Sequence, residues 1–209
     1  MVIIVPLLLL LLGAVGDVFT VVANSYVRYL YFLGGCVLMF VIDYFTSKNN
    51  QMLKTFHHES THFLVNLITF RKILMLRVDT TGGVVSSIGK SWMLEAVSLA
   101  PYCFPLAAYV VMVFGYFFAY DMAMFYSIIL GMAYAFHLLC VKDDFVSWRL
   151  MGIHQPDINQ YPLAFSYLYI FCFWLFNTII VLLSVRTDIV GAVEFLFSCF
   201  KESVLSLIS

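Results

Sequence analysis

Long apolar stretches dominate this sequence and limit what it can fold into. Five of them reach about the twenty residues that a helix needs to cross a bilayer, at 2–22, 26–45, 92–119, 122–141 and 162–185. The chain is 63% hydrophobic and 11% charged, whereas soluble domains carry about 25% charged residues. A soluble protein of 209 residues could not bury so much apolar surface. We therefore expect an all-α polytopic membrane protein. Its net charge of −1 argues against a nucleic-acid partner.

The remaining segments complete a single domain, residues 1–209, with about six membrane helices. The run at 2–22 is long for a signal-peptide core, and no basic residue precedes it, so we expect it to stay as the first of two spans within 1–45. Residues 51–69 begin polar and become apolar after His62, which predicts a shorter, partly embedded helix. Three spans follow within 92–185, and 189–200 suit a short interfacial helix.

A small β-hairpin is expected after the helix at 51–69. Residues 74–79 alternate apolar and polar, and a second β-prone run ends at Ile88. Gly82 and Gly83 lie between the two runs, so the pattern predicts a hairpin over 74–88 with its turn at these glycines.

Basic residues predict the orientation in the membrane. Six lie between 48 and 90, and Lys142 and Arg149 lie in a second segment, whereas the link around Asp121 has none. The positive-inside rule then places 46–90 and 142–160 in the cytoplasm and brings both polar segments to one face. The small size and this bias suit a multi-pass protein of a bacterial inner membrane.

One motif in the sequence is typical of a catalytic metal site. His58, Glu59 and His62 form H-E-x-x-H. On a helix, the two histidines lie one turn apart on the same face and can bind one zinc ion. Glu59 can then reach a zinc-bound water as a general base without being a ligand. His57 falls about 100° away from the ligand face, so it is expected to support the ligands or face solvent.

This motif, in a small and aromatic-rich membrane protein, resembles the site-2-protease family of intramembrane zinc metalloproteases. The hairpin expected at 74–88 and the prolines Pro101 and Pro105 at the start of the next span extend the resemblance, which covers roughly residues 30–180. It implies a metalloendopeptidase with one Zn²⁺ per chain. Its substrate would be a membrane protein cleaved in or next to a transmembrane segment, and a regulatory membrane partner is possible.

The third zinc ligand is the open question of this motif. Family members take it from an aspartate on a later membrane helix, in an L-D-G or N-P-D-G setting, and neither string occurs here. We select Asp157, because Pro156 suits the first turn of a helix that would hold this carboxylate at the cytoplasmic face. Asp143, Asp144, His154 and His137 remain alternatives.

Substrate contacts are expected at three residues. Leu76 and Val78 lie on the predicted hairpin, whose open edge would bind an extended peptide by strand addition. Asn177 in the last span would bond either to substrate or to a neighbouring helix. The alternative to a protease is an inactive protease-like scaffold or chaperone. A transporter fits less well, because the polar residues gather at one face instead of at mid-membrane on several helices.

Overall fold

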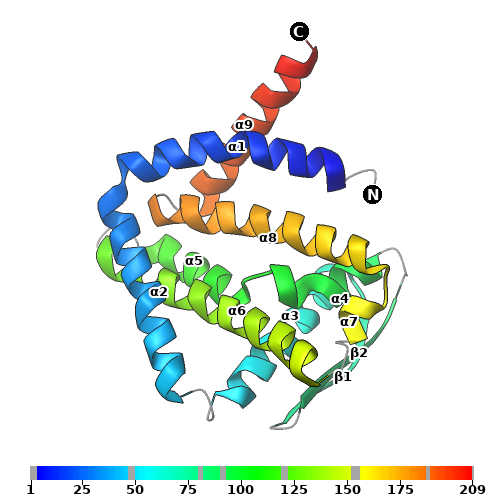
Figure 1. Cartoon of the computed structure of the whole chain (residues 1–209). Helices are drawn as coiled ribbons and strands as arrows, with labels where there is room; N and C mark the ends of the chain where they lie inside the picture. The colour runs from blue at the N-terminus through cyan, green and yellow to red at the C-terminus, as the bar shows by residue number, and fades with distance from the viewer. Residues whose placement is uncertain are drawn as a thin grey trace.

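The computed structural model describes residues 4–46, 50–79, 82–89, 93–118, 122–151, 156–186 and 189–208. Within these ranges the chain is mostly helical, with a two-stranded hairpin at one end of the helical bundle (Figure 1). The elements are α1 Ile4–Asn24, α2 Tyr26–Thr46, α3 Gln51–Ile68, β1 Lys72–Asp79, β2 Gly82–Ile88, α4 Leu94–Cys103, α5 Leu106–Phe118, α6 Ala123–Met151, α7 Pro156–Asn159, α8 Leu163–Arg186 and α9 Ile189–Ile208.

Three helices of the described chain are long and apolar enough to cross a membrane. They are α2, the part of α6 from Ala123 to Phe145, and α8. The bent pair α4 and α5 adds a fourth candidate if it counts as one span. These helices support a membrane protein, and the expected number of about six spans is not confirmed within the described residues. The first expected span lies in α1, of which Leu8–Asn24 is an apolar helix.

The continuous span expected at 92–119 is wrong, because α4 and α5 meet at an angle of 78°. Pro105 has no backbone N–H and disfavours helical geometry in the residue before it. Phe104 accordingly has φ −103° and ψ 104°, an extended conformation that ends α4. The side chain of Asn177 in α8 satisfies the freed carbonyl of Cys103, with a hydrogen bond of 3.0 Å. This break leaves α4 free to turn toward α3.

Helices α2 and α6 pack closely through glycines. A side chain at Gly35 would collide with the carbonyl of Ile128, and one at Gly131 would collide with the carbonyl of Phe32. Close approach of backbones through small residues is typical of membrane helices. The pair forms a wall beside the start of the shorter α3.

Lys54 fixes the start of α3 to this wall. Its Nζ lies 2.6 Å from Asp43 of α2 and 2.6 Å from Asp143 of α6, and the residue is only 5% exposed. Moving α3 away from α2 and α6 would separate the Lys54 ammonium from both carboxylates and leave buried charges unpaired, which is costly. The ion pairs therefore hold the start of α3 in this position. The two segments expected to share one membrane face, 46–90 and 142–160, therefore meet.

The hairpin is confirmed, but its turn is not at the glycines. Strands β1 and β2 pair antiparallel, with Asp79 opposite Gly82 and Val78 opposite Gly83, so both glycines belong to β2. The strands pack on α3 at the end of the bundle (Figure 1). At the other end of the chain, the helix expected over 189–200 continues to Ile208 as α9, which projects beyond α1 (Figure 1).

Candidate metal centre

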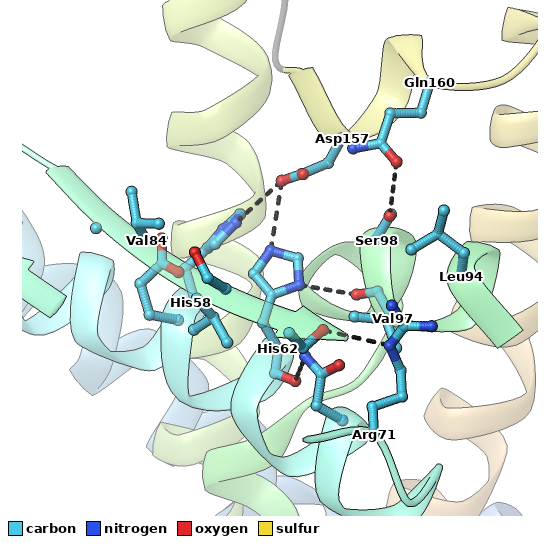
Figure 2. Close-up of a pocket in the computed structure, with 15 residues that line it drawn as sticks. His58, His62, Arg71, Val84, Leu94, Val97, Ser98, Asp157 and Gln160 are labelled. Atoms are coloured by element: carbon cyan, nitrogen blue, oxygen red, sulfur yellow. Dashed lines mark hydrogen bonds and ion pairs between the residues drawn. The ribbon is translucent and has the colours of Figure 1, made fainter. Parts of the chain in front are cut away.

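Three side chains converge at the end of the bundle. His58 and His62 lie one turn apart on α3, with ring centroids 4.9 Å apart. The Nε2 atoms of His58 and His62 lie 3.6 Å and 3.4 Å from the same oxygen, Oδ2 of Asp157 (Figure 2). Asp157 is the second residue of the short helix α7, which begins at Pro156. The residue selected from the sequence as third ligand therefore lies beside the two histidines.

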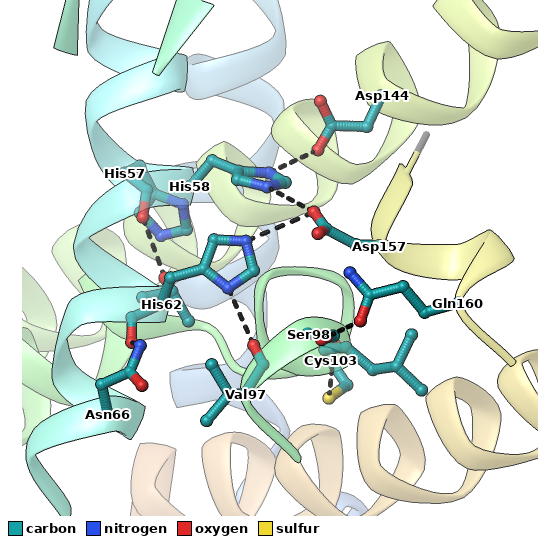
Figure 3. Close-up of polar contacts among 12 residues, drawn as sticks. His57, His58, His62, Asn66, Val97, Ser98, Cys103, Asp144, Asp157 and Gln160 are labelled. Carbon is teal, nitrogen blue, oxygen red and sulfur yellow. Dashed lines mark hydrogen bonds and ion pairs between the residues drawn. The ribbon is translucent and has the colours of Figure 1, made fainter. Parts of the chain in front are cut away.

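The other nitrogen of each imidazole has its own partner. Nδ1 of His58 lies 3.0 Å from Oδ2 of Asp144 in α6, and Nδ1 of His62 lies 2.8 Å from the backbone carbonyl of Val97 in α4 (Figure 3). A carbonyl only accepts, so Nδ1 of His62 donates, and Nε2 is the atom left to bind a metal. Metal-binding histidines commonly have such an outer partner, which fixes the ring and the tautomer.

The donor set fits a zinc ion. Ligand atoms at 2.0–2.1 Å from a tetrahedral zinc are about 3.3–3.4 Å from one another. The two measured nitrogen–oxygen separations, 3.4 and 3.6 Å, are near this value, and all three donor atoms lie within 4.8 Å of one another. Both separations are also longer than the 2.7–3.2 Å of an N–H···O hydrogen bond. The three atoms are therefore close enough together to bind a common ion.

The charged groups of this centre influence one another. Burial disfavours the charged form of His58, but the carboxylates of Asp144 and Asp157 outweigh it and raise the pKa to about 10. Burial would raise the pKa of Asp157, yet the two imidazoles hold that pKa well below its usual range. A cation is therefore favoured between these groups, and a divalent metal would take the place of the proton.

Glu59 lines the same cavity and is only 7% exposed. Its carboxylate packs against Gly83 of β2, where a β-carbon would come within 2.7 Å of Cδ and Oε1. Burial raises the pKa of Glu59, while the neighbouring imidazoles of His58 and His62 oppose the rise. A carboxylate with a raised pKa is better matched to proton transfer near neutral pH.

The cavity has a volume of about 490 Å³ and opens between α3, β2, α4 and α7. Its strand wall is β2, from Gly83 to Ser87. Leu76 and Val78, expected to contact substrate, lie on β1 and do not line the cavity, and Leu76 is 43% exposed. Both strands contact α3, and the alternation along β1 could not reveal that β2 is the strand that lines the cavity. The other lining residues are His58, Glu59, His62, Asn66, Arg71, Leu94, Val97, Ser98, Asp157 and Gln160.

Asn177 lies outside this cavity. It accepts a hydrogen bond of 2.6 Å from the hydroxyl of Tyr109 and donates to the carbonyls of Cys103 and Phe173. Its amide is 5% exposed and fully used within the helices. Of the two roles open to it from the sequence, the structure shows the bond to a neighbouring helix.

The alternative third ligands lie elsewhere or have other partners. Asp143 binds Lys54 at 2.6 Å and lies 3.6 Å from Lys142, and Asp144 binds the outer nitrogen of His58. His137 is fully buried in α6, with its ring 5.7 Å from that of His57. His154 lies outside the described residues. His57 itself is 6% exposed and does not face solvent.

Two supporting groups could not be found from sequence. Val97 contributes its backbone carbonyl, and any residue type can do so. Arg71 follows α3 and could be counted only as one of several basic residues of a cytoplasmic segment. Both are recruited by the packing of α4 and the hairpin on α3.

Comparisons with protein-family models, with curated proteins and with solved structures found no match to this chain. The functional assignment therefore depends on the geometry of the site.

Proposed function

We propose that this protein is a zinc-dependent intramembrane endopeptidase that hydrolyses a peptide bond in or next to a transmembrane segment of a membrane protein. One observation carries the proposal. The Nε2 atoms of His58 and His62 converge on Asp157 while each Nδ1 is held by an outer partner, and Glu59 lies in the same cavity. Two histidines and one carboxylate around zinc are a known hydrolytic set.

The residues have distinct roles in this proposal. His58, His62 and Asp157 would hold one zinc ion, which supplies Lewis acidity and a water of lowered pKa when bound. Glu59 takes the proton of the attacking water and passes it to the leaving amine. Asp144 and the Val97 carbonyl hold the two imidazole rings in their orientation, so the rings need not turn when zinc binds. The apolar bundle behind α3 keeps bulk water from the site.

The site lies at one end of the candidate spans. It lies where α3 and β2 meet α4, α7 and the later part of α6. Figure 1 shows these elements together at one end of the bundle. We place this end at the cytoplasmic face of a bacterial inner membrane, because the segments that form it carry most of the basic residues. In this arrangement α1 and the α4–α5 pair would also cross the membrane, which brings the number of spans closer to six. The substrate would approach from the bilayer, and a membrane partner could regulate its access.

Replacing Glu59 with glutamine tests the proposal. The amide keeps the shape but cannot accept the proton, so cleavage should fall by at least about 10²–10⁴-fold while zinc content stays near one per chain. The assay reconstitutes the full chain with a library of single-span membrane peptides and detects products by mass spectrometry. Glu95→Gln is the matched control, since Glu95 in α4 does not line the cavity.

The outcomes separate the two functional classes. Cleavage by wild type and Glu95→Gln but not by Glu59→Gln supports a protease. Equal cleavage by all three chains would exclude Glu59 as the base and with it this mechanism. A wild-type chain that holds zinc but cleaves no peptide would support the scaffold instead.

A further inference from the structure

Arg71 introduces a positive charge into the cavity that the hydrolytic mechanism does not use. Within the described residues that line the cavity, it is the one lysine or arginine. In Figure 2 it lies on the opposite side of His62 from Asp157. Once Asp157 is bound to a metal, Arg71 and Glu59 are the remaining charged side chains of the lining.

The end of α3 places Arg71 at this position. The backbone N–H of Arg71 bonds to the carbonyl of Asn66 at 2.9 Å, and that of Phe70 bonds to the carbonyl of Leu67 at 3.0 Å. Phe70 has a φ of 54°, in the left-handed region that usually belongs to glycine at such a helix end. A non-glycine residue in this conformation costs on the order of 1 kcal/mol. The chain therefore reverses sharply, and Arg71 comes back beside the helix it follows.

The hairpin then holds the side chain of Arg71. Its Nε donates to Oγ of Ser87 in β2 at 3.2 Å. Gly89 lies against the aliphatic part, where a β-carbon would come within 2.8 Å of Cγ and 3.3 Å of Cα of Arg71. A larger residue at position 89 would displace the side chain. The hydroxyl of Ser87 thus orients the guanidinium, and the missing side chain of Gly89 leaves space for the aliphatic part of Arg71.

We propose that Arg71 binds a carboxylate of the substrate and so selects peptides with aspartate or glutamate close to the scissile bond. A guanidinium keeps its positive charge at every physiological pH and carries several N–H donors, which suit a carboxylate. The walls of the cavity limit the screening of such a charge pair by water, so it is stronger than one at an open surface. This inference rests on the proposed protease function and names the substrate class of the same cavity.

The experiment compares peptides that differ only in one carboxylate. A single-span peptide that wild type cleaves is made with glutamate or glutamine at each position flanking the cut, and with a free or an amidated C-terminus. We expect glutamate to raise kcat/KM by about 10–100-fold over glutamine at one position, whatever the C-terminus. A preference that follows the free C-terminus instead would assign Arg71 to a terminal carboxylate and overturn the side-chain selection.

Variants of the enzyme test the residue itself. Arg71→Gln should cleave the glutamate and glutamine peptides at similar rates, and Arg71→Glu should prefer a lysine peptide, with zinc content unchanged in both. Arg77→Gln is the control, because Arg77 is 73% exposed on β1, pairs with Asp79 and does not line the cavity. If Arg71→Gln keeps the wild-type preference, the inference is wrong.

A binding measurement separates this inference from the proposed function. The zinc-loaded Glu59→Gln chain is titrated with the same glutamate and glutamine peptides. A tenfold or larger preference for glutamate that Arg71→Gln abolishes supports the carboxylate site even if wild type cleaves nothing. Equal binding of both peptides, together with equal cleavage by wild type, overturns the inference while leaving the protease intact.

Discussion

The two faces of α3 carry histidines in opposite circumstances. On the face toward α4 and α7, both nitrogens of His58 and of His62 have partners, and the Nε2 atoms converge on Asp157. On the face toward α6, His57 packs beside His137 and the edge of Phe136. None of the four ring nitrogens of His57 and His137 has a hydrogen-bond partner among the described residues.

This difference separates a candidate metal site from a cluster of histidines. His57, His62 and His137 are buried and His58 is half-buried, and both pairs bring two imidazoles within 6 Å, with centroids 4.9 Å and 5.7 Å apart. In addition, each ring of the His58–His62 pair has a hydrogen-bond acceptor at Nδ1, and the carboxylate of Asp157 lies opposite both Nε2 atoms. Only outer partners fix the direction of the lone pairs, and fixed lone pairs are what a metal ion needs. The two faces therefore make different predictions.

Removing a ligand histidine should have the largest effect. We expect His58→Ala or His62→Ala to lower zinc from about one per chain to nearly none, because two ligands cannot hold a structural or catalytic zinc site. His57→Ala should keep the wild-type content, although it lies next to His58 in sequence. Metal analysis of the purified chains checks both. A wild-type zinc content in both ligand variants would show that these histidines do not bind zinc.

Asp157→Asn should have the next largest effect. The amide oxygen carries no charge and is a weaker zinc ligand, so the affinity should fall by more than the 10–100-fold typical of a lost outer partner. Asp143→Asn should leave zinc affinity unchanged, because Asp143 binds Lys54 instead. Competition with a zinc-binding dye measures both constants. If Asp143→Asn loses zinc and Asp157→Asn does not, the third ligand is misassigned.

Asp144→Asn should have an intermediate effect. Asp144 holds the outer nitrogen of His58, and losing such a partner lowers metal affinity by about 10–100-fold. The zinc content at saturating metal should remain near one per chain, so affinity changes and stoichiometry does not. His62 offers no equivalent variant, since its outer partner is the backbone of Val97. Unchanged affinity in Asp144→Asn would show that this contact does not support the metal.

How far the sequence predicts these features depends on how local they are. The one-turn spacing of His58 and His62 and the alternation over the hairpin are local patterns, so the motif helix and the two strands could be placed from the residues alone. The pairing of Glu59 with Gly83, or of Asn177 with Cys103, joins elements far apart in the chain. Such contacts depend on packing that no spacing encodes.

Two differences from the sequence prediction have identifiable physical causes. The break between α4 and α5 comes from Pro105, which was visible in the sequence but lies inside an uninterrupted apolar run. The cavity is lined by β2 rather than β1, because Gly83 lets that strand approach Glu59. Glycines placed near the end of a hairpin are therefore as consistent with close packing as with a turn.

The smallest expected effect concerns the second face of α3. A buried polar group without a hydrogen bond costs about 1–3 kcal/mol, and an apolar residue of similar shape avoids that cost. We therefore expect His137→Leu, and more so the double variant His57→Leu with His137→Leu, to raise the free energy of unfolding by about 1–3 kcal/mol per residue. Zinc affinity should not change. Thermal unfolding in detergent, with and without zinc, checks both statements.

The double variant makes this last comparison decisive. If each single variant destabilises the protein and the double variant restores stability, the two imidazoles interact favourably with each other, and the second face is a polar contact between α3 and α6. If any of these variants loses zinc, the two faces act as one site through the shared backbone of His57 and His58. Stabilisation in all three chains with full zinc binding would show that the faces are independent. In that case the chemistry of α3 is confined to the side on which each imidazole has an outer partner.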